Sequence, residues 1–461
     1  MKLTQKRGPL IQDLLKNKQL LRRAIKLGEG PVQVLIPEQM KHNIRDLLIT
    51  LEDLGLRSRV MFAHKSSRSN VFALQAAQSE IGIDVASREE LISALSAGFR
   101  GRSIECTGPK NTRFLRLALQ HECLISCDSL LELETIENLG VPAQILLRIS
   151  DPRAADRSLK VRASRFGILQ EDVPKAYEMF KRSPQLSLQG FHIHTDERAA
   201  DVKAGFLENM ISLMEQSYIE GFSPSIINIG GGLRTQTIED IREWEHYVSF
   251  LEEAIIERKN PKTWRNFTYG LALNQKGRIS GREKIQGKMT TGSATTVLQE
   301  MFENRSLRER TLSEIIRENM WTVMTEPGSL LLQQAGITLV EVIGVKSSTY
   351  GPIILCDANM YNLSIQMHEM FLDPVLLSDE PEHRFEGFLM GNLCREEDIL
   401  MKRKVAFSRV PKQGDIICFL NTASYGDFED SNPHKHPSLR KLVAVKNDDW
   451  TLVDEAAYDP W

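Results

Sequence analysis

Short apolar segments in the first 330 residues end on residues that could take part in chemistry. Lys65 follows the apolar run at residues 60–63 and His64. A lysine in such surroundings is expected to be desolvated, which lowers its pKa and makes the neutral amine available to form a Schiff base with an aldehyde. The glycines 230–232 follow another apolar run, and such a triplet lets backbone amides approach a phosphate closely. Together the two motifs predict one cofactor that carries both an aldehyde and a phosphate.

Other apolar segments end in the same way. A single residue of this kind has an ordinary explanation, because a strand-end aspartate usually caps a helix and a lone histidine is usually a satisfied core residue. A glutamate at such a position often forms an ion pair. Eight polar or glycine ends, all at the carboxyl ends of apolar segments, favour a functional site. In chain order they are Lys65, Asp84, Thr107, Asp128, Arg148, His194, the triplet Gly230, Gly231 and Gly232, and Glu326.

The apolar segments alternate with helical patterns. Each run is followed by a polar or glycine turn, and the first five begin about 20 residues apart, the length of one strand plus one helix. Ser129 and Glu132 have the spacing of a capping box at a helix start, as do Ser87 and Glu90. Eight such units predict a closed (β/α)8 barrel, with an open doubly wound sheet as the alternative. The runs lie at residues 60–63, 81–85, 104–107, 124–127, 145–149, 191–194, 226–229 and 322–325.

The rest of the chain completes the predicted organisation. Residues 1–31 mix basic residues with leucines and predict an amphipathic segment that packs on the second domain. Residues 32–335 are expected to form the barrel domain, with residues 259–320 as an insertion that is long for a simple connection. Residues 336–461 show strands without long helices between them, which predicts an antiparallel β domain. The strands expected there lie at residues 337–345, 353–355, 404–407, 416–420 and 441–445.

Composition and charge argue against several classes of protein. The formal net charge is −3, so neither nucleic acid nor an anionic membrane is expected as a partner. No run approaches the roughly 20 apolar residues that span a bilayer. The six cysteines are scattered without a CxxC pair, so no disulfide framework and no metal site are expected, and a reducing cytoplasm is the expected location.

Taken in order, the motifs resemble those of the fold-type-III pyridoxal-phosphate decarboxylases, the family that includes ornithine, arginine and diaminopimelate decarboxylases. The resemblance covers roughly residues 32–445, which is nearly the whole chain. Single motifs such as the glycine triplet are weak, but nine in family order, each in the expected strand context, are specific. They begin at Ala63, Asp84, Thr107, Ser164, Gly190, Asn228, Glu326, Gly391 and Asn421.

The resemblance implies a pyridoxal-phosphate-dependent amino-acid decarboxylase that is a homodimer with shared active sites. Lys65 would hold the cofactor as a Schiff base, His194 would stack on the pyridine ring, and Glu326 would keep the ring nitrogen protonated so that the ring is an electron sink. Cys394 from the second subunit would return a proton to the substrate carbon. Asp84 and Arg148 would support the site. The phosphate would be held by Gly230, Gly231, Gly232 and Tyr425.

The sequence departs from the family pattern at several positions. Ser329 stands where an arginine usually binds the phosphate, and Arg234 is a candidate replacement. Arg395 follows the cysteine, where diamine-forming relatives place a carboxylate. Arg395 therefore predicts a substrate with a distal carboxylate, phosphate or neutral polar group, unless Arg395 points to solvent and Glu396 or Glu397 turns inward, which would restore a preference for basic amino acids. The other departures are Thr195, Asp196 and Glu197 in place of a Gly-Ser motif, and Ser67 in place of an asparagine.

Three other functions are compatible with parts of the sequence. A racemase or epimerase shares the barrel and the lysine, but Cys394 favours decarboxylation because such a racemase typically uses a tyrosine base there. A non-catalytic cofactor-binding protein would explain the lost phosphate anchors, but it needs no proton donor. A metal-dependent hydrolase would use His192, His194 and Asp196, of which the histidines share a strand face. That reading leaves Lys65 and the glycines without a purpose.

Overall fold

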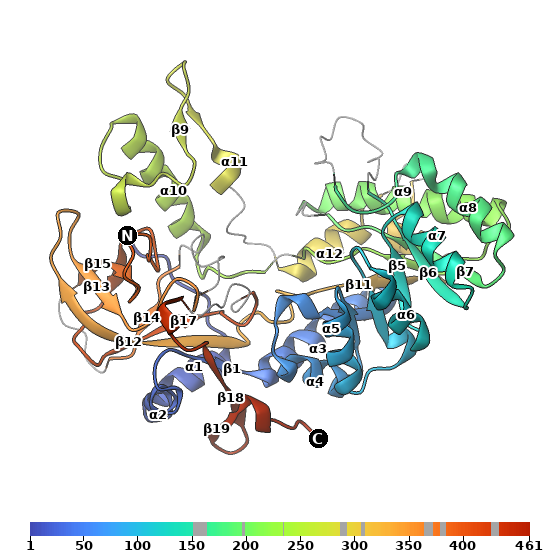
Figure 1. Ribbon diagram of the computed structural model, residues 1–461. Coiled ribbons are helices and arrows are strands. Elements are labelled where there is room, and N and C mark those ends of the chain that lie inside the picture. The colour runs from blue at the N-terminus through green and yellow to red at the C-terminus, as the bar shows by residue number, and fades with distance from the viewer. Residues whose placement is uncertain are drawn as a thin grey trace. The chain divides into compact units, whose positions relative to one another are not determined.

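A computed structural model describes residues 1–150, 164–195, 199–233, 235–285, 293–305, 309–363, 372–378, 384–425 and 433–461. The chain divides into two compact units (Figure 1). The sheet unit takes residues 1–40, 235–291 and 332–458, and the barrel unit takes residues 41–234, 292–331 and 459–461. Residues 32–40 and 235–291, which we expected in the barrel domain, therefore lie in the sheet unit.

The barrel unit confirms the predicted (β/α)8 fold. Eight parallel strands close in the order β11-β2-β3-β4-β5-β6-β7-β8, and each predicted apolar run overlaps one of them. Buried side chains from five strands form a cluster within this unit, namely Met61, Leu124, Leu146, Ile226 and Met324. The strands are β2 (Arg57–Ala63), β3 (Gly82–Val85), β4 (Ile104–Cys106), β5 (Leu124–Cys127), β6 (Ala143–Arg148), β7 (Leu186–His192), β8 (Ile226–Asn228) and β11 (Thr322–Thr325).

The helices of this unit begin at caps that also tie them to the strands. Ser129 caps its helix by accepting a hydrogen bond from the amide of Glu132. The Glu132 carboxylate reaches back to the amide of Asp128, one residue beyond the partner that a capping box predicts. The helix start is thereby fixed to the end of β5. The helices are α3 (Pro37–Asp53, which begins in the sheet unit), α4 (Asn70–Gln78), α5 (Arg88–Ser96), α6 (Thr112–Gln120), α7 (Leu130–Leu139), α8 (Val173–Arg182), α9 (Ala200–Ile219), α12 (Ala294–Phe302) and α13 (Leu312–Glu318).

The sheet of the other unit is mixed, so the prediction of a purely antiparallel domain is wrong in this detail. Its main path runs β16-β15-β13-β12-β1-β18-β19, and β17 pairs with β12 and β14. The pairs β1–β18 and β13–β15 are parallel, in the first case because a strand from the N-terminal region inserts beside β12. The strands are β1 (Val32–Leu35), β12 (Gly336–Lys346), β13 (Ile353–Cys356), β14 (Val375–Leu376), β15 (Phe385–Met390), β16 (Val405–Phe407), β17 (Ile416–Leu420), β18 (Arg440–Lys446) and β19 (Trp450–Asp454).

The N-terminal segment forms α1 (Pro9–Lys16) and α2 (Lys18–Gly28). Leu14 and Leu21 from these helices are buried in one cluster with Val34 of β1 and Leu339 of β12. The residues between β8 and β11 belong to both units. The sheet unit holds α10 (Ile241–Ile256), β9 (Ala272–Leu273), β10 (Ile279–Ser280) and α11 (Arg282–Ile285), whereas α12 and α13 lie in the barrel unit.

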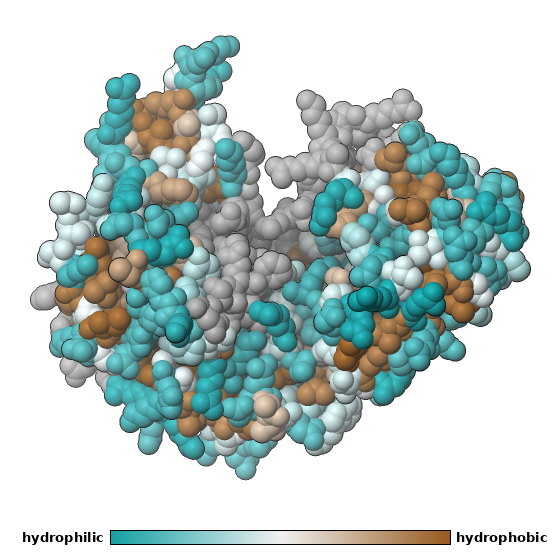
Figure 2. Space-filling view, in the orientation of Figure 1, coloured by the Kyte–Doolittle hydropathy of each residue, from teal (hydrophilic) through white to brown (hydrophobic). Residues whose placement is uncertain are grey.

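Hydrophilic residues cover most of the surface seen in Figure 2, and the apolar residues form separate small patches among the hydrophilic ones. Single exposed apolar residues such as Leu131 and Ile219 are ordinary on a folded protein. Among the helices of the described residues, none has the length and apolar character to cross a bilayer.

Candidate active site

Lys65 lies in a short 3₁₀ turn, His64–Ser66, directly after β2. Its Nζ is 3.3 Å from Oδ2 of Asp84 on β3, whose side chain is fully buried. The other oxygen of Asp84 accepts a 2.6 Å hydrogen bond from the Thr107 hydroxyl, just after β4. The Lys65 side chain is 37% exposed, so the expectation of a desolvated lysine is wrong. A buried carboxylate, itself held by a neighbouring strand, positions the amine instead.

The carboxyl group of Glu326 lies at the end of β11 and is part of a buried polar network. Its Oε1 accepts a 2.6 Å hydrogen bond from Nδ2 of Asn228 on β8. The same amide nitrogen lies 2.9 and 3.1 Å from the two carboxyl oxygens of Glu105 on β4. Burial, followed by the charge of Asp84, raises the pKa of Glu326 to about 7, although the charge of Lys65 opposes this shift. Glu326 is therefore a buried carboxyl group of unusually high proton affinity.

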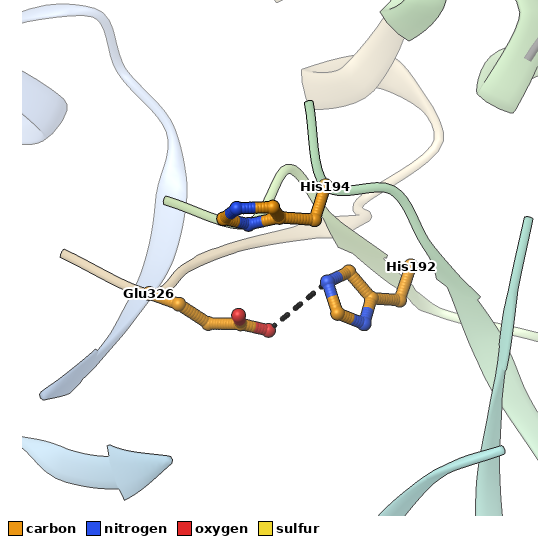
Figure 3. Close-up of side chains that lie close together, drawn as sticks. All are labelled: His192, His194 and Glu326. Atoms are coloured by element: carbon orange, nitrogen blue, oxygen red, sulfur yellow. Dashed lines mark ion pairs between the residues drawn. The ribbon is translucent and has the colours of Figure 1, made fainter. Parts of the chain in front are cut away.

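Two histidines converge on Glu326 from the end of β7 (Figure 3). His192 Nε2 lies 3.2 Å from Oε1 of Glu326, and its Nδ1 is 2.6 Å from the Ser126 hydroxyl. His194 Nδ1 accepts a hydrogen bond from the amide of Gly231 at 3.2 Å. Burial, followed by the charge of Lys65, lowers the pKa of His194 to about 3. The ring is therefore neutral at neutral pH, and because Nδ1 is an acceptor, its proton is on Nε2.

The three side chains in Figure 3 also offer one ligand atom each within 4.8 Å of one another. A metal ion here would lie among positive charges, because Lys65, Arg148 and Lys203 all act on His194. Like charges disfavour a further cation, whereas the carboxyl groups of Glu326 and Asp84 at the same site favour one. Asp196, the third residue of the metal-dependent alternative, lies outside the described residues.

The glycine triplet lies after β8 and packs too closely for side chains. A Cβ atom on Gly231 would lie 2.6 Å from the carbonyl oxygen of Glu326, and one on Gly232 would lie 2.8 Å from that of Thr195. Gly230 and Gly232 have φ angles of 66° and 72°, in the left-handed region that favours glycine. Close packing and this backbone form are typical of an anion-binding loop.

Lys203 brings a positive charge to this loop. It is 6% exposed on α9, and its Nζ lies 3.5 Å from the carbonyl oxygen of Gly231. Ser329, at the position where an arginine is usual, lies in the turn that follows β11. Arg234, our candidate for the missing charge, lies outside the described residues. Lys203 was not among our predicted site residues, although a lysine beside the apolar stripe of residues 202–214 is the signal that could have shown it.

Arg148 is buried at the end of β6 and is held from two sides. Its Nη1 lies 3.6 Å from Oδ1 of Asp128, and its guanidinium carbon is 4.6 Å from the centre of the Phe166 ring. Asp128 also accepts a hydrogen bond from the amide of Gly167. Arg148 thus links β6 to the Ser164–Gly167 motif and supplies positive charge to the histidines.

The predicted site residues of the C-terminal part lie in the sheet unit, so the barrel unit by itself contains none of them. Cys394 is exposed after β15, and its amide is 3.5 Å from Nδ1 of His434. Arg395 contacts the hydroxyl of Tyr361 at 3.2 Å. Glu396 is 74% exposed and forms an ion pair with Arg265. Tyr425 has a left-handed φ of 53°.

Sequence reasoning also missed Glu105 and Asn228 as functional residues, and it named His192 only as a ligand in the metal-dependent alternative. Asn228 belongs to a recognised motif, but its bridging role depends on Glu105, which is distant in sequence. Glu105 is fully buried within β4, and a charged residue inside an otherwise apolar run was the signal.

Among the other departures from the family pattern, Ser67 is buried in the turn after Lys65, whereas Glu197 lies outside the described residues.

Comparison of the sequence with known proteins places these residues in context. Residues 40–264 match the family described as pyridoxal-dependent decarboxylase, pyridoxal binding domain. An uncharacterized protein from Sinorhizobium fredii is 25% identical over 440 residues, which cover 91% of this chain and 88% of that protein. Diaminopimelate decarboxylase from Staphylococcus aureus is 22% identical over 404 residues, covering 85% of this chain and 82% of that enzyme.

Solved structures share the fold. Diaminopimelate decarboxylase from M. jannaschii, in complex with L-lysine, aligns with a TM-score of 0.70 at 18% identity, covering 94% of this chain and 91% of that one. The arginine decarboxylase of Paramecium bursaria Chlorella virus aligns with a TM-score of 0.69 at 16% identity, covering 93% of this chain and 99% of that one. At these identities the likeness shows a common fold of barrel and sheet.

Proposed function

We propose that this chain, a divergent member of the fold-type-III pyridoxal-phosphate decarboxylase family, decarboxylates an amino acid, with Lys65 and Cys394 as the reacting residues. The observation that carries this proposal is the meeting of an amine, a buried carboxyl group, a neutral histidine and a glycine loop at the strand ends of one barrel. Lys65, Glu326, His194 and Gly231 provide these four groups.

The residues present fit pyridoxal phosphate. The glycine loop has no room for side chains, as a phosphate cradle requires, and Lys203 adds a buried positive charge beside it. His192 Nε2 is buried, and no group of the described residues is aligned to form a hydrogen bond with it. A polar atom of this kind, aimed at Glu326, is expected where a polar ligand completes the network.

Each residue has a distinct task in this proposal. Lys65 would attach the cofactor covalently through its amine, with Asp84 holding that amine at the strand ends. Glu326 would accept a hydrogen bond from the ring nitrogen, and the neutral ring of His194 would lie against the ring face without a competing charge. When bound, pyridoxal phosphate supplies a protonated ring that takes up the electron pair left by carbon dioxide.

Cys394 would then return a proton to the substrate carbon. It lies in the sheet unit and is exposed. In a two-fold dimer, an exposed loop of one subunit can complete the barrel site of the other. A thiol is needed for protonation but not for mere storage of the cofactor. This difference supports an enzyme over a non-catalytic binding protein.

The residues beside Cys394 support a substrate with a distal acidic or neutral polar group. Arg395 is 44% exposed and pairs with Glu397, so it presents a positive charge next to the cysteine. Glu396 is engaged by Arg265. A distal ammonium group would meet a like charge at Arg395, whereas a distal carboxylate or phosphate would be attracted.

The proposal is tested by trapping the cofactor and by measuring turnover. Protein incubated with pyridoxal phosphate should absorb visible light, and borohydride should fix the cofactor to the peptide that contains Lys65. A panel of amino acids is then scored for carbon dioxide, for amine and for racemised substrate, in the wild type and in Lys65→Ala. Decarboxylation in the wild type and loss in the variant are expected, and Arg395→Asp should shift the preference toward lysine or ornithine. A protein that cannot be loaded with the cofactor would contradict the proposal, and racemisation without carbon dioxide would show the alternative activity.

A further inference from the structure

Two carboxyl groups meet inside the barrel without solvent. Glu105 has no exposed surface, and its carboxyl group is in hydrogen-bond contact with that of Glu326. Asn228 donates to both groups from one amide nitrogen and holds them together. Glu105 stands between the apolar residues Ile104 and Cys106 of β4. We therefore explain the burial of Glu105 by its pairing with Glu326.

Two carboxyl groups in contact cannot both be ionised in a buried site, so one of them must carry a proton. The surrounding charges decide which one. Glu326 faces Lys65 and Arg148, whose positive charges favour its ionised form, as well as Asp84. Glu105 faces Asp84 and Glu326, and burial raises its pKa well above the ordinary value.

Two further groups act on this pair. Arg59 on β2 interacts with Glu105 and remains a cation, so it opposes protonation of Glu105, but burial and the charges of Glu326 and Asp84 are the largest effects on that group. His192 lies 3.2 Å from Glu326 and is kept neutral, because burial and the charge of Arg148 lower its pKa. Above the pKa of Glu326, which is about 7, the arrangement is therefore a protonated Glu105 that donates to an ionised Glu326.

We propose that Glu105 is a positioning residue that shares its proton with Glu326 and thereby keeps the next proton on the ring nitrogen of the cofactor. This inference rests on the proposed function. A carboxylate that accepts a strong hydrogen bond is a weaker base than one that does not. With Glu105 present, Glu326 therefore leaves the proton on the nitrogen. Without that donor, Glu326 becomes the stronger base and removes it.

Two variants of Glu105 separate this role from a purely structural one. Glu105→Gln keeps a donor of the same size, through its amide. Glu105→Leu keeps the volume and removes the donor. Glu132→Gln is the matched control, since Glu132 is also a buried carboxyl group of the barrel but pairs with Lys110.

The first measurement uses the cofactor-free protein. Infrared spectra at about pH 8, where an ordinary glutamate is ionised, should show the band of a protonated carboxylic acid in the wild type. The band should be lost in both Glu105 variants and kept in Glu132→Gln. A wild-type spectrum without this band would overturn the shared proton, whether or not the cofactor binds.

The second measurement uses protein loaded with pyridoxal phosphate that carries ¹⁵N in the ring. The ring resonance should have the position of a protonated nitrogen in the wild type, Glu105→Gln and Glu132→Gln. It should shift to the position of an unprotonated nitrogen in Glu105→Leu. An unshifted resonance in a fully loaded Glu105→Leu would overturn the inference while leaving the proposed function intact. Failure of the wild type to load at all would instead contradict the proposed function, and the infrared result would still decide the state of the pair.

Discussion

The carboxyl group of Glu326 imposes a pH-dependent cost on the fold. Its pKa is raised by burial to about 7, whereas the unfolded chain has the ordinary value. Between these two values the folded chain binds more protons than the unfolded chain, so stability falls as the pH rises through this window. The full cost is on the order of 3 kcal/mol and is an upper limit, because Glu105 and Lys65 titrate with the same network.

Glu326→Gln should remove this cost. In cofactor-free protein, the variant should gain stability relative to the wild type as the pH is raised from about 5 to about 8, by up to roughly 3 kcal/mol. Urea unfolding at several pH values measures the difference. The exposed Glu245→Gln is the control and should follow the wild type. A stability difference that does not change with pH would contradict the raised pKa.

Lys203 is expected to contribute to the binding of the phosphate group of the cofactor and not to the binding of its ring. Loss of a charge-assisted contact to phosphate costs on the order of tenfold in affinity or more. Lys203→Met should therefore bind pyridoxal phosphate at least about tenfold more weakly than the wild type, yet bind pyridoxal, which lacks the phosphate, equally well. Absorbance titrations with both compounds give the two affinities, and Lys203→Arg should restore much of the loss. Equal weakening for both compounds would show that Lys203 only supports the fold.

At the scale of single residues, the sequence shows the groups that end strands but not the groups that meet inside the barrel. Lys65, His194 and Glu326 were predicted because each follows an apolar run. Glu105 and His192 were missed because their contacts with Glu326 join strands that lie more than 100 residues apart in the chain. The predicted desolvation of Lys65 failed for a similar reason. The exposure of a side chain depends on the loops that surround it, and the sequence of its own strand does not predict those loops.

At the scale of elements, Gly190 sets how closely β7 and β8 approach. A Cβ atom there would lie 1.8 Å from the carbonyl oxygen of Ile226. The two strands lead to the site, because the histidines lie at the end of β7 and the glycine loop follows β8. Gly190→Ala should cost roughly 3 kcal/mol and lower cofactor affinity, because the two strands must separate. Urea unfolding and cofactor titration measure both effects. Gly344→Ala, a strand glycine with open space around it, should change neither, and equal behaviour of the two variants would contradict the role of Gly190.

Strands that alternate with helices were predictable because each unit carries its own local signals, namely an apolar run, a turn and a helix cap. The sheet unit was predicted less completely. β14 and β19 are short or partly exposed, and so carry weak apolar patterns. β1, which we expected in the barrel domain, lies in the sheet unit for a different reason. Four buried residues fit either a barrel or a sheet, and the choice is made by partners far along the chain.

At the scale of the whole molecule, the proposed dimer with shared active sites predicts that activity needs two chains. If Cys394 of one chain completes the barrel site of another, the inactive variants Lys65→Ala and Cys394→Ala should complement each other. Random exchange of subunits gives one intact site in half of the dimers, so about a quarter of wild-type activity should return. Activity measured after mixing and demonstrated exchange tests this. No recovery would place both residues in one chain's site or remove Cys394 from the reaction.

The pairing of β1 also affects the order in which the molecule can be completed during synthesis. β1 ends at Leu35, and its two neighbours in the sheet begin at Gly336 and Arg440. At about 5–20 residues per second, a ribosome needs roughly 15–60 s to produce the first of these partners. Throughout that interval the apolar faces of α1, α2 and β1 have no sheet to cover them, while the strands of the barrel emerge in sequence. These helices and β1 are therefore made long before the strands that cover them, and a nascent chain stalled before β12 would present them to chaperones.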